Sequence, residues 1–294
     1  MAWIKKGPIL VPSLAHEDTA VYQPIIRVEG ARWRMWYTAG WHHGYGVCYA
    51  ECNGDPTVAA NWVKRPTPIC PGIDFTFIAE ANGRLHMLYA YDPTPNDLGA
   101  NIYAAESFDN GETWDFAGGS PLVIPDGPQQ LHQVGPVLVN DSSGPDRHLL
   151  YSSIASGGAW KMFVAHDYGL GFKRTRIPVD SLSRYPNGAT GVTGNVVKIG
   201  SEFHAWPHGG PSGNLPSDIR HAKTSNPKLD DGWEFLYDGA IVIGRDGPEW
   251  DQAADAFMVE NGGKSYMFYD RDNNDTGVAH ICVAVHDGPL STAP

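Results

Sequence analysis

Arg34-Met35-Trp36-Tyr37-Thr38 opens a pattern that recurs along the whole chain, in which bulky residues lead to a Tyr or a Trp. The aromatic position returns at intervals of 52 to 63 residues. The later copies are Met87-Leu88-Tyr89, Leu149-Leu150-Tyr151, His204-Ala205-Trp206 and Met267-Phe268-Tyr269. Self-similarity at such a period is typical of proteins built from repeated supersecondary units. The sequence therefore predicts five copies of one β unit.

Each copy is flanked by further strand-like segments. In the first unit, the β-branched segment Pro24-Ile25-Ile26-Arg27-Val28 comes before it, and Val47-Cys48-Tyr49-Ala50 comes after it. In the fourth unit, the matching third strand is predicted at Ile219-Arg220-His221-Ala222. A fourth, polar strand follows in most units, and its aromatic start is found at Trp62, Trp114, Phe172 and Trp233. Four strands per unit and five units predict an all-β chain that forms a single five-bladed β-propeller over residues 1–294.

The two ends of the chain are expected to share one blade. The fifth unit ends soon after Ala284, without a fourth strand. The segment from Trp3 to Leu10 resembles the fourth strand of other units, for example the segment from Trp62 to Ile69. An N-terminal strand that completes the last blade would close the ring and leave no open seam between the first and last blades.

The composition agrees with this fold and argues against several classes of protein. Hydrophobic residues are 42% of the chain, which supplies a large core, and the 34 Gly and 23 Pro fit many tight turns. No run approaches the ~20 apolar residues of a membrane span. A net charge of −12 without a basic run argues against a nucleic-acid partner. No signal peptide is visible, so we expect a cytoplasmic protein, or a secreted one whose leader is absent.

One short motif stands out between the third and fourth strands of the second unit. The segment Ser107-Phe108-Asp109-Asn110-Gly111-Glu112-Thr113-Trp114 fits the Asp-box pattern Ser-x-Asp-x-Gly-x-Thr-Trp. Its Asp and Gly favour a tight turn, and its Trp is expected to pack back between blades. This loop belongs to the face opposite the usual binding mouth of a propeller, so we interpret the motif as structural.

The mouth of the predicted channel collects polar and aromatic side chains. Loops that enter the first strand of each blade meet there with loops that join the second and third strands. Aromatic faces stack on sugar rings, while carboxylates and amides bond sugar hydroxyls, so a carbohydrate-sized ligand fits this lining. The candidate substrate-binding residues are Gln23, Trp41, His42, His43, Asp92, Gln133, His208 and Arg271. Arg271 would either clamp a substrate carboxylate or pair with Asp270 or Asp272.

The repeat resembles the blades of the five-bladed glycoside hydrolase superfamily, which includes families 32, 43, 62, 68, 117 and 130. The segments that carry the likeness are 34–38, 105–111 and 264–270. The resemblance implies a set of catalytic carboxylates at the mouth. In family 43 a base Asp precedes Pro in the first inner strand, where this chain has Gln23-Pro24. The acid Glu of that family precedes Gly-Pro in the third blade, where this chain has Val134-Gly135-Pro136.

Other residues at the mouth are candidates for these missing roles. Asp255 stands seven residues before Gly262, as Gln23 stands seven before Gly30, so it starts the inner strand of the fifth unit. The catalytic candidates are Asp18, Asp74, His132 and Asp255. Two carboxylates, or a carboxylate and a His, could run an inverting hydrolysis in which one group activates water and the other protonates the leaving oxygen.

Several functions remain open at this stage. A glycoside hydrolase that cleaves an oligo- or polysaccharide is the first hypothesis. A glycan-binding propeller without catalysis is the alternative, favoured by the residues at the two expected acid positions. A polysaccharide lyase using His132 is a further alternative. A sialidase is disfavoured, because such enzymes resemble six-bladed propellers with several Asp-boxes.

No cofactor is expected, although a structural cation such as calcium in the channel is compatible with the sequence. The four cysteines show no metal-type pairing beyond Cys48-x3-Cys52, so we predict no metal site and expect buried free thiols. The expected partner is a carbohydrate, with neither nucleic acid nor membrane. The sequence does not define the oligomeric state, the sugar or the linkage.

Overall fold

The structure is a computed structural model, and every statement below concerns the residues that it describes. These are residues 2–40, 46–71, 75–81, 84–91, 101–116, 133–140, 147–154, 160–167, 172–179, 194–209, 217–226, 228–247, 250–273 and 275–294.

The described chain is almost entirely β, as predicted. Its helices are 3-10 turns of three or four residues: η1 (Ala15–Glu17), η2 (Ala59–Asn61), η4 (Leu236–Gly239) and η5 (Leu290–Thr292). In this part of the chain, no helix has the length and apolar character needed to cross a bilayer.

Four sheets have the strand order of propeller blades, in which each strand pairs with the next. They are named here by their innermost strands. The β2 blade runs β2 (Val21–Glu29), β3 (Arg32–Ala39), β4 (Gly46–Cys52) and β5 (Trp62–Lys64), with β6 (Cys70–Pro71) also on β4. The β10 blade runs β10 (Gln133–Asn140), β11 (Arg147–Ile154), β12 (Trp160–Asp167) and β13 (Phe172–Pro178). The β14 blade runs β14 (Val196–Ile199), β15 (Glu202–Ala205), β18 (Ala222–Thr224) and β19 (Glu234–Phe235).

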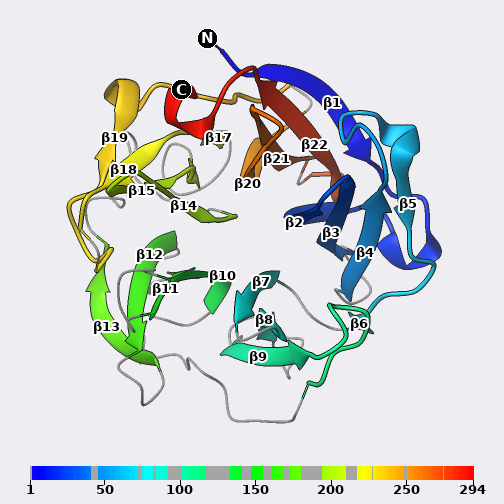
Figure 1. The fold of residues 1–294 in the computed structure, drawn as a ribbon, viewed down its shortest axis with the longest axis horizontal. Helices are drawn as coiled ribbons and strands as arrows, with labels where there is room; N and C mark the ends of the chain where they lie inside the picture. The colour runs from blue at the N-terminus through cyan, green and yellow to red at the C-terminus, as the bar shows by residue number, and fades with distance from the viewer. Residues whose placement is uncertain are drawn as a thin grey trace.

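The fourth of these sheets brings the two ends of the chain together. The β20 blade runs β20 (Gln252–Asn261), β21 (Lys264–Asn273), β22 (Val278–His286) and then β1 (Ile4–Leu10). A further sheet contains β7 (Phe75–Ala81), β8 (Arg84–Tyr91) and β9 (Asn101–Ser107). The sheets lie around a common axis with β2, β7, β10, β14 and β20 nearest to it (Figure 1). The predicted propeller arrangement is therefore confirmed.

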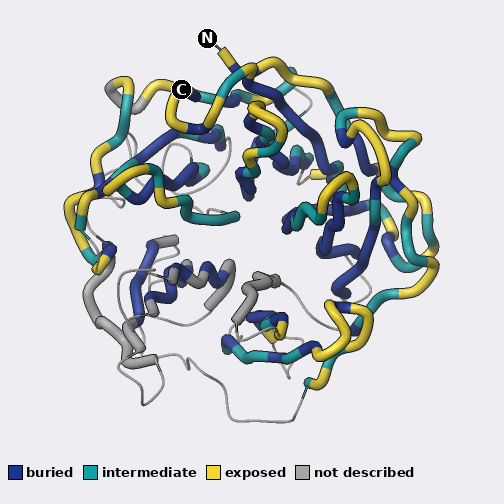
Figure 2. The backbone as a smooth tube through the Cα atoms, in the orientation of Figure 1, coloured by how far each residue is buried: buried dark blue, intermediate teal, exposed yellow. Residues whose placement is uncertain are grey.

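The repeated aromatic motif is explained by its place in the blade. It lies on the second strand of the blade. Neighbouring sheets cover both faces of that strand, so residues that point to either face are buried. Trp36 and Tyr37 are both fully buried, and the same is true of Tyr151 and Trp206. Figure 2 shows this buried backbone in the strands, while the exposed backbone lies mostly toward the rim. Burying large aromatic side chains is a main source of stability between sheets.

The third strand of the β14 blade differs from its prediction. The sequence pattern placed it at 219–222, but the observed strand β18 begins at Ala222. Upstream, β17 (Asp218–Ile219) pairs with β16 (His208–Gly209) as a separate two-stranded sheet. Pro207 interrupts the ladder because proline has no N–H to donate. The four cysteines are buried free thiols, as predicted.

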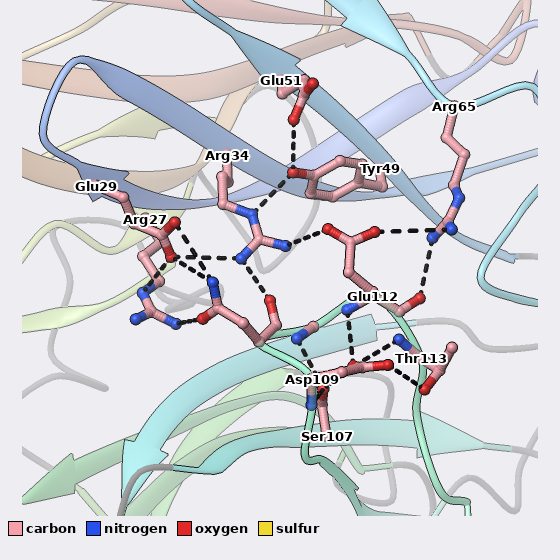
Figure 3. A network of polar contacts seen from close by, with 12 residues as sticks. Arg27, Glu29, Arg34, Tyr49, Glu51, Arg65, Ser107, Asp109, Glu112 and Thr113 are labelled. Atoms are coloured by element: carbon pink, nitrogen blue, oxygen red, sulfur yellow. Dashed lines mark hydrogen bonds and ion pairs between the residues drawn. The ribbon is translucent and has the colours of Figure 1, made fainter.

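The Asp-box forms a closed turn that is held by its own polar side chains (Figure 3). Asp109 Oδ1 accepts hydrogen bonds from Ser107 Oγ at 2.8 Å, from Thr113 N at 2.8 Å and from Glu112 N at 3.1 Å. The hydroxyl of Thr113 also donates to Asp109 Oδ2 at 2.5 Å, and this bond, followed by those from Thr113 N and the Ser107 hydroxyl, lowers the pKa of Asp109 to about 2. The motif therefore acts as a structural turn, as expected.

This turn docks onto the β2 blade through Arg34, which is completely buried. The guanidinium donates to the carbonyl oxygen of Asn110 and lies 3.3 Å from Glu29 Oε1 (Figure 3). It also stacks 4.7 Å from the ring centroid of Trp36. Gly111, with φ +86°, makes the close approach possible: a Cβ there would lie 2.8 Å from the Trp36 ring. The Asp-box thus fixes the β7 sheet against the β2 blade.

Candidate functional site

A β-bulge near the start of β20 presents Asp255. The pairing of β20 with β21 shifts register between Ala254 and Phe257, and Asp255 adopts a φ of 50°. The same shift occurs in β2 between Tyr22 and Ile25, where Gln23 has a φ of 53°. A bulge re-aims the side chain that it carries. The two positions are therefore equivalent in their blades.

The equivalence extends to the neighbouring strand. Ala254 faces Asp270 in one blade, and Tyr22 faces Thr38 in the other. In the β2 blade, Thr38 Oγ1 donates to Gln23 Oε1 at 3.2 Å. In the β20 blade, the matching pair is Asp255 and Asp270, whose carboxyl groups share a hydrogen bond. One blade thus carries a neutral pair where the other carries two acids.

A third acid joins this pair. Asp270 and Asp272 alternate along β21 and so point to the same face of the strand. Asp255, Asp270 and Asp272 are 7%, 2% and 5% exposed. Among the described residues, no group of three or more His, Cys, Asp or Glu side chains is arranged to hold a metal ion. The three acids form a buried cluster in which the pKa of each member is raised.

Burial and mutual repulsion keep protons on this cluster. Loss of solvation raises the pKa of Asp255 well above its ordinary value, and the negative charges of Asp270 and Asp272 raise it further. The same two causes, burial first and then Asp270, raise the pKa of Asp272. Burial raises the pKa of Asp270 to about 6, opposed by the hydrogen bond from the backbone N–H of Gln23. Asp270 is therefore the member expected to ionise most readily.

Two glutamines bound the acid cluster on either side. The backbone N–H of Gln23 donates to Asp270 Oδ1 at 3.2 Å. Because Thr38 occupies the Gln23 side-chain carbonyl oxygen, the amide NH2 is left to face Asp255, whose pKa it lowers slightly. On the other side, Gln252 Nε2 donates to Asp272 Oδ2. These donors stabilise the ionised forms and limit how far each pKa rises.

His208 leaves one oxygen of Asp255 without a protein partner. The backbone N–H of Asp255 donates to His208 Nδ1 at 3.2 Å, which occupies the lone pair of that nitrogen. The same nitrogen lies 3.6 Å from Asp255 Oδ1, which is beyond hydrogen-bond distance. Within the described residues, buried Asp255 Oδ1 has no hydrogen-bond partner. A buried carboxyl oxygen of this kind is suited to contact a ligand.

The β14 blade holds the bulge in place. Gly194 N donates to Ala256 O at 3.0 Å, and a Cβ on Gly194 would lie only 2.6 Å from that oxygen. The side chain of Asn195 exchanges two hydrogen bonds of 2.9 Å with the backbone of Met258. Asp255 is thus positioned by its own blade, by Gln23 of the β2 blade and by residues of the β14 blade.

The structure brings together three of the residues predicted from sequence, namely Asp255, Gln23 and His208. Asp18 is exposed at the end of η1, with a φ of 49°. Arg271 points away from the acid cluster because neighbours on a strand face opposite sides. Its Nη1 lies 3.2 Å from Asp246 Oδ2, and its guanidinium stacks 4.3 Å from the Trp250 ring centroid. Arg271 therefore pairs with Asp246 and not with Asp270 or Asp272.

Several other candidates lie outside the described residues. Gln133 is the first residue of β10, but its side chain is not among those described. The remaining candidates outside the described residues are Trp41, His42, His43, Asp74, Asp92 and His132.

The sequence reasoning missed the roles of Asp270 and Asp272. A usable signal was present: they follow the aromatic motif of the last unit as Asp270-Arg271-Asp272, and Asp270 aligns with Thr38 of the first unit. Alternation places both acids on one face of the strand. Gly194 could not have been found this way, because its role depends on a contact between two blades.

Solved structures of glycoside hydrolases share this fold. BT0996, solved as a complex with RGII, matches with a TM-score of 0.74 at 17% identity, over 98% of this chain and 92% of that protein. The α-L-arabinofuranosidase PaAbf62A from Podospora anserina, solved with cellotriose, matches with a TM-score of 0.70 at 13% identity, over 98% and 97%. An exo-1,5-α-L-arabinanase from a bovine ruminal metagenomic library matches with a TM-score of 0.62 at 12% identity, over 93% and 95%.

Similarity at these identities shows a shared fold. It confirms the predicted resemblance to the β-propeller glycoside hydrolases, with family 43 and family 62 enzymes among the matches. No protein-family model matches the sequence, and no curated protein does. The chain is therefore not assigned to a family.

Proposed function

We propose that this protein is a glycoside hydrolase that cleaves a glycosidic bond at the mouth of the central channel, beside Asp255 of the β20 blade and Gln23 of the β2 blade. The observation that carries the proposal is the free, buried Oδ1 of Asp255 within a cluster of acids that holds protons. A general acid must be protonated at the working pH, and a raised pKa supplies that condition. The shared fold with known glycoside hydrolases supports the same conclusion.

In this proposal Asp255 donates its proton to the glycosidic oxygen as the bond from that oxygen to the anomeric carbon breaks. The proton leaves with the departing sugar, and Asp255 becomes a carboxylate. A second group removes a proton from water, which attacks the anomeric carbon from the opposite face. An inverting enzyme places the two groups roughly 6.5–9.5 Å apart. Asp74, Asp18 and His132 are the proposed candidates for this second group.

Asp270 and Asp272 do not need to touch the substrate in this scheme. The burial of Asp255 itself, and then the charges of Asp270 and Asp272, raise the pKa of Asp255, so the two neighbours act as positioning residues that tune it. Sugar contacts would come from Gln23 and His208 beside Asp255, and from the other predicted mouth residues. Those further residues are Trp41, His42, His43, Asp92 and Gln133.

We further propose that the ring contains five blades and is closed by the N-terminal strand. The antiparallel pairing of β1 with β22 supports closure, as does the hydrogen bond of 3.2 Å from Trp3 Nε1 to the carbonyl oxygen of Pro294. The β7 sheet, with three described strands, would be the remaining blade.

A glycan-binding propeller without catalysis is the second candidate. The observation that favours it is the amide of Gln23, which stands in the β2 blade where the resemblance implies a catalytic base. A binder of this kind would retain the contacts of Asp255 and His208 with sugar hydroxyls but would release no product.

Product release from aryl glycosides and from plant, algal and bacterial polysaccharides tests the proposal. The wild type is compared with Asp255→Asn and with a matched control, Asp115→Asn, whose side chain is exposed beside the Asp-box. A hydrolase releases reducing sugar in the wild type and the control but not in Asp255→Asn. Full activity in Asp255→Asn would overturn the role of this acid. Binding without release would favour the binder, and a product with the ultraviolet absorbance of an unsaturated sugar would favour a lyase.

A further inference from the structure

A groove of about 680 Å³ lies at the seam between the β20 blade and the β2 blade. Residues of β1, β21 and the β20–β21 turn line one side, and Trp33 and the segment 54–57 after β4 line the other. Asn261 in this groove follows Asp255 by six positions on the same strand, which corresponds to about 20 Å at ~3.3 Å per residue. The groove is therefore separate from the acid cluster.

Aromatic side chains line part of this groove. Tyr266 and Trp33 pack edge to face, with ring centroids 4.9 Å apart. Trp33 is only 3% exposed, so it supports Tyr266 from below. Tyr266 is half-buried and lines the groove. A supported tyrosine ring of this kind offers an apolar face to a sugar ring while its hydroxyl stays near water.

The polar side chains of the groove carry both signs of charge and both kinds of hydrogen-bonding group. Lys6 and Lys264 are balanced by Asp55 and Asp287, so the groove has no net charge from these four residues. Lys264 and Asp287 are 3.9 Å apart and largely exposed, so they are weakly engaged. In the part of the chain that the structure describes, the side chains of Lys6 and Asn261 have no hydrogen-bond partner. Donors are thus available to a ligand.

We propose that this groove binds a short, neutral stretch of a polysaccharide chain, at a second site distinct from the acid cluster. A sugar matches both features, because it has an apolar face and a rim of hydroxyls that donate and accept. A fully apolar ligand would desolvate the lysine, aspartate and asparagine side chains without replacing their hydrogen bonds with water. An anionic ligand would gain little, because each lysine is matched by an aspartate.

Such a site would hold a polymer against the protein while another part of the polymer reaches the acid cluster. It would raise the local concentration of bonds to be cleaved, through the effective concentration that a second attachment supplies. Small substrates that cannot span about 20 Å would gain nothing from it. The inference therefore concerns binding, and it does not depend on whether the acid cluster is catalytic.

Affinity electrophoresis in native gels that contain soluble arabinoxylan, arabinan or polygalacturonate provides the test. All proteins carry Asp255→Asn, so that contributions from the acid cluster are equal and the polymers stay intact. Two groove variants are compared: Tyr266→Ala, which removes the aromatic face, and Ala31→Arg, which fills the groove from an exposed turn without removing a core contact. Tyr237→Ala is the matched control, because this tyrosine is 55% exposed and does not line the groove.

We expect a neutral polymer to retard the parent and the Tyr237→Ala control, and both groove variants to weaken binding about two- to twelvefold, the range for loss of one aromatic contact. Polygalacturonate should bind no better than the neutral polymers. The proposal is overturned if the groove variants migrate like the control in every gel, or if no polymer retards the parent. Hydrolysis of a small aryl glycoside by Ala31→Arg with Asp255 intact reports on the proposed function separately.

Discussion

Replacing Asp270 by asparagine should stabilise the protein at neutral pH, although it removes a charged residue from the candidate site. Asp270 is 2% exposed, and burial raises its pKa to about 6 from an ordinary value of 3.8. A carboxyl group with a raised pKa favours folding when it is protonated and opposes folding once it ionises. The native state therefore loses stability as the pH rises from about 4 through about 6.

The size of the effect follows from these two pKa values. A difference of about two units corresponds to ~3 kcal/mol of native-state cost when Asp270 is fully ionised. At pH 5 the same linkage relation gives a cost of about 1.5 kcal/mol, because the folded group is still mostly protonated. The asparagine of the Asp270→Asn variant would keep an acceptor for the Gln23 N–H and would not ionise. The stabilisation by Asp270→Asn should thus grow by ~1.5 kcal/mol between pH 5 and pH 8.

Urea unfolding of the wild type and the variant, followed by tryptophan fluorescence at pH 5, 6, 7 and 8, measures this difference directly. Asp287→Asn serves as the control for removing an exposed charge. A stability difference that stays constant with pH, or that falls as pH rises, would refute the idea that burial strains the Asp270 carboxylate. The variant should also shift the alkaline limb of any activity profile to lower pH, because Asp255 loses a repelling charge and so its pKa falls.

Three further perturbations follow from contacts between or within blades. Gly194→Ala should cost about 1–3 kcal/mol in thermal unfolding, because its Cβ would lie 2.6 Å from a carbonyl oxygen of β20, and it should lower activity as well. Lys64→Met should cost about 3–5 kcal/mol in urea unfolding, because Lys64 Nζ lies 2.7 Å from the fully buried Glu17. Glu17 has a lowered pKa, so the stabilisation by the Lys64–Glu17 ion pair should disappear as the pH falls through the pKa of Glu17 in the folded protein. Gly111→Ala should cost about 1–3 kcal/mol in the same assay, because its φ is +86° and its Cβ would meet the Trp36 ring.

The fold was accessible from sequence because its signal is repeated. The aromatic second strand is buried on both faces in every unit, so bulky residues recur at the same place regardless of local loop lengths. The predicted bounds of the third strand in the β14 blade were wrong, because the prediction treated residues 219–222 as one continuous strand. Pro207 on the facing strand accepts from Arg220 N at 3.0 Å but has no N–H to return, so one ladder bond is missing there, and this effect depends on pairing that a single strand does not reveal.

The site was only partly accessible, because its chemistry depends on groups that meet across strands and blades. Asp255 was found through its offset from the following glycine, which fixes its place at the bulge. The free oxygen of Asp255 depends on His208 Nδ1, which accepts from the Asp255 N–H and lies 3.6 Å from Oδ1, and Gly194 matters through its contact with the bulge. Neither relation leaves a mark in the spacing of residues along the chain. Such contacts arise from packing between sheets, which the repeat predicts only in outline.

The comparison of the β2 and β20 blades explains why an acid cluster can exist at one place in a repeated fold. Both blades have the same bulge with a left-handed residue, and both pair it with the same position of the next strand. In the β2 blade, the neutral side chains of Gln23 and Thr38 hydrogen-bond to each other at this position, so no protonated carboxyl group is needed there. Asp255 and Asp270 pair in the same way only if protons are held between them. The backbone N–H of Gln23, in the neutral pair, donates to Asp270 in the acidic pair. This contact between the two blades favours the negative charge on Asp270.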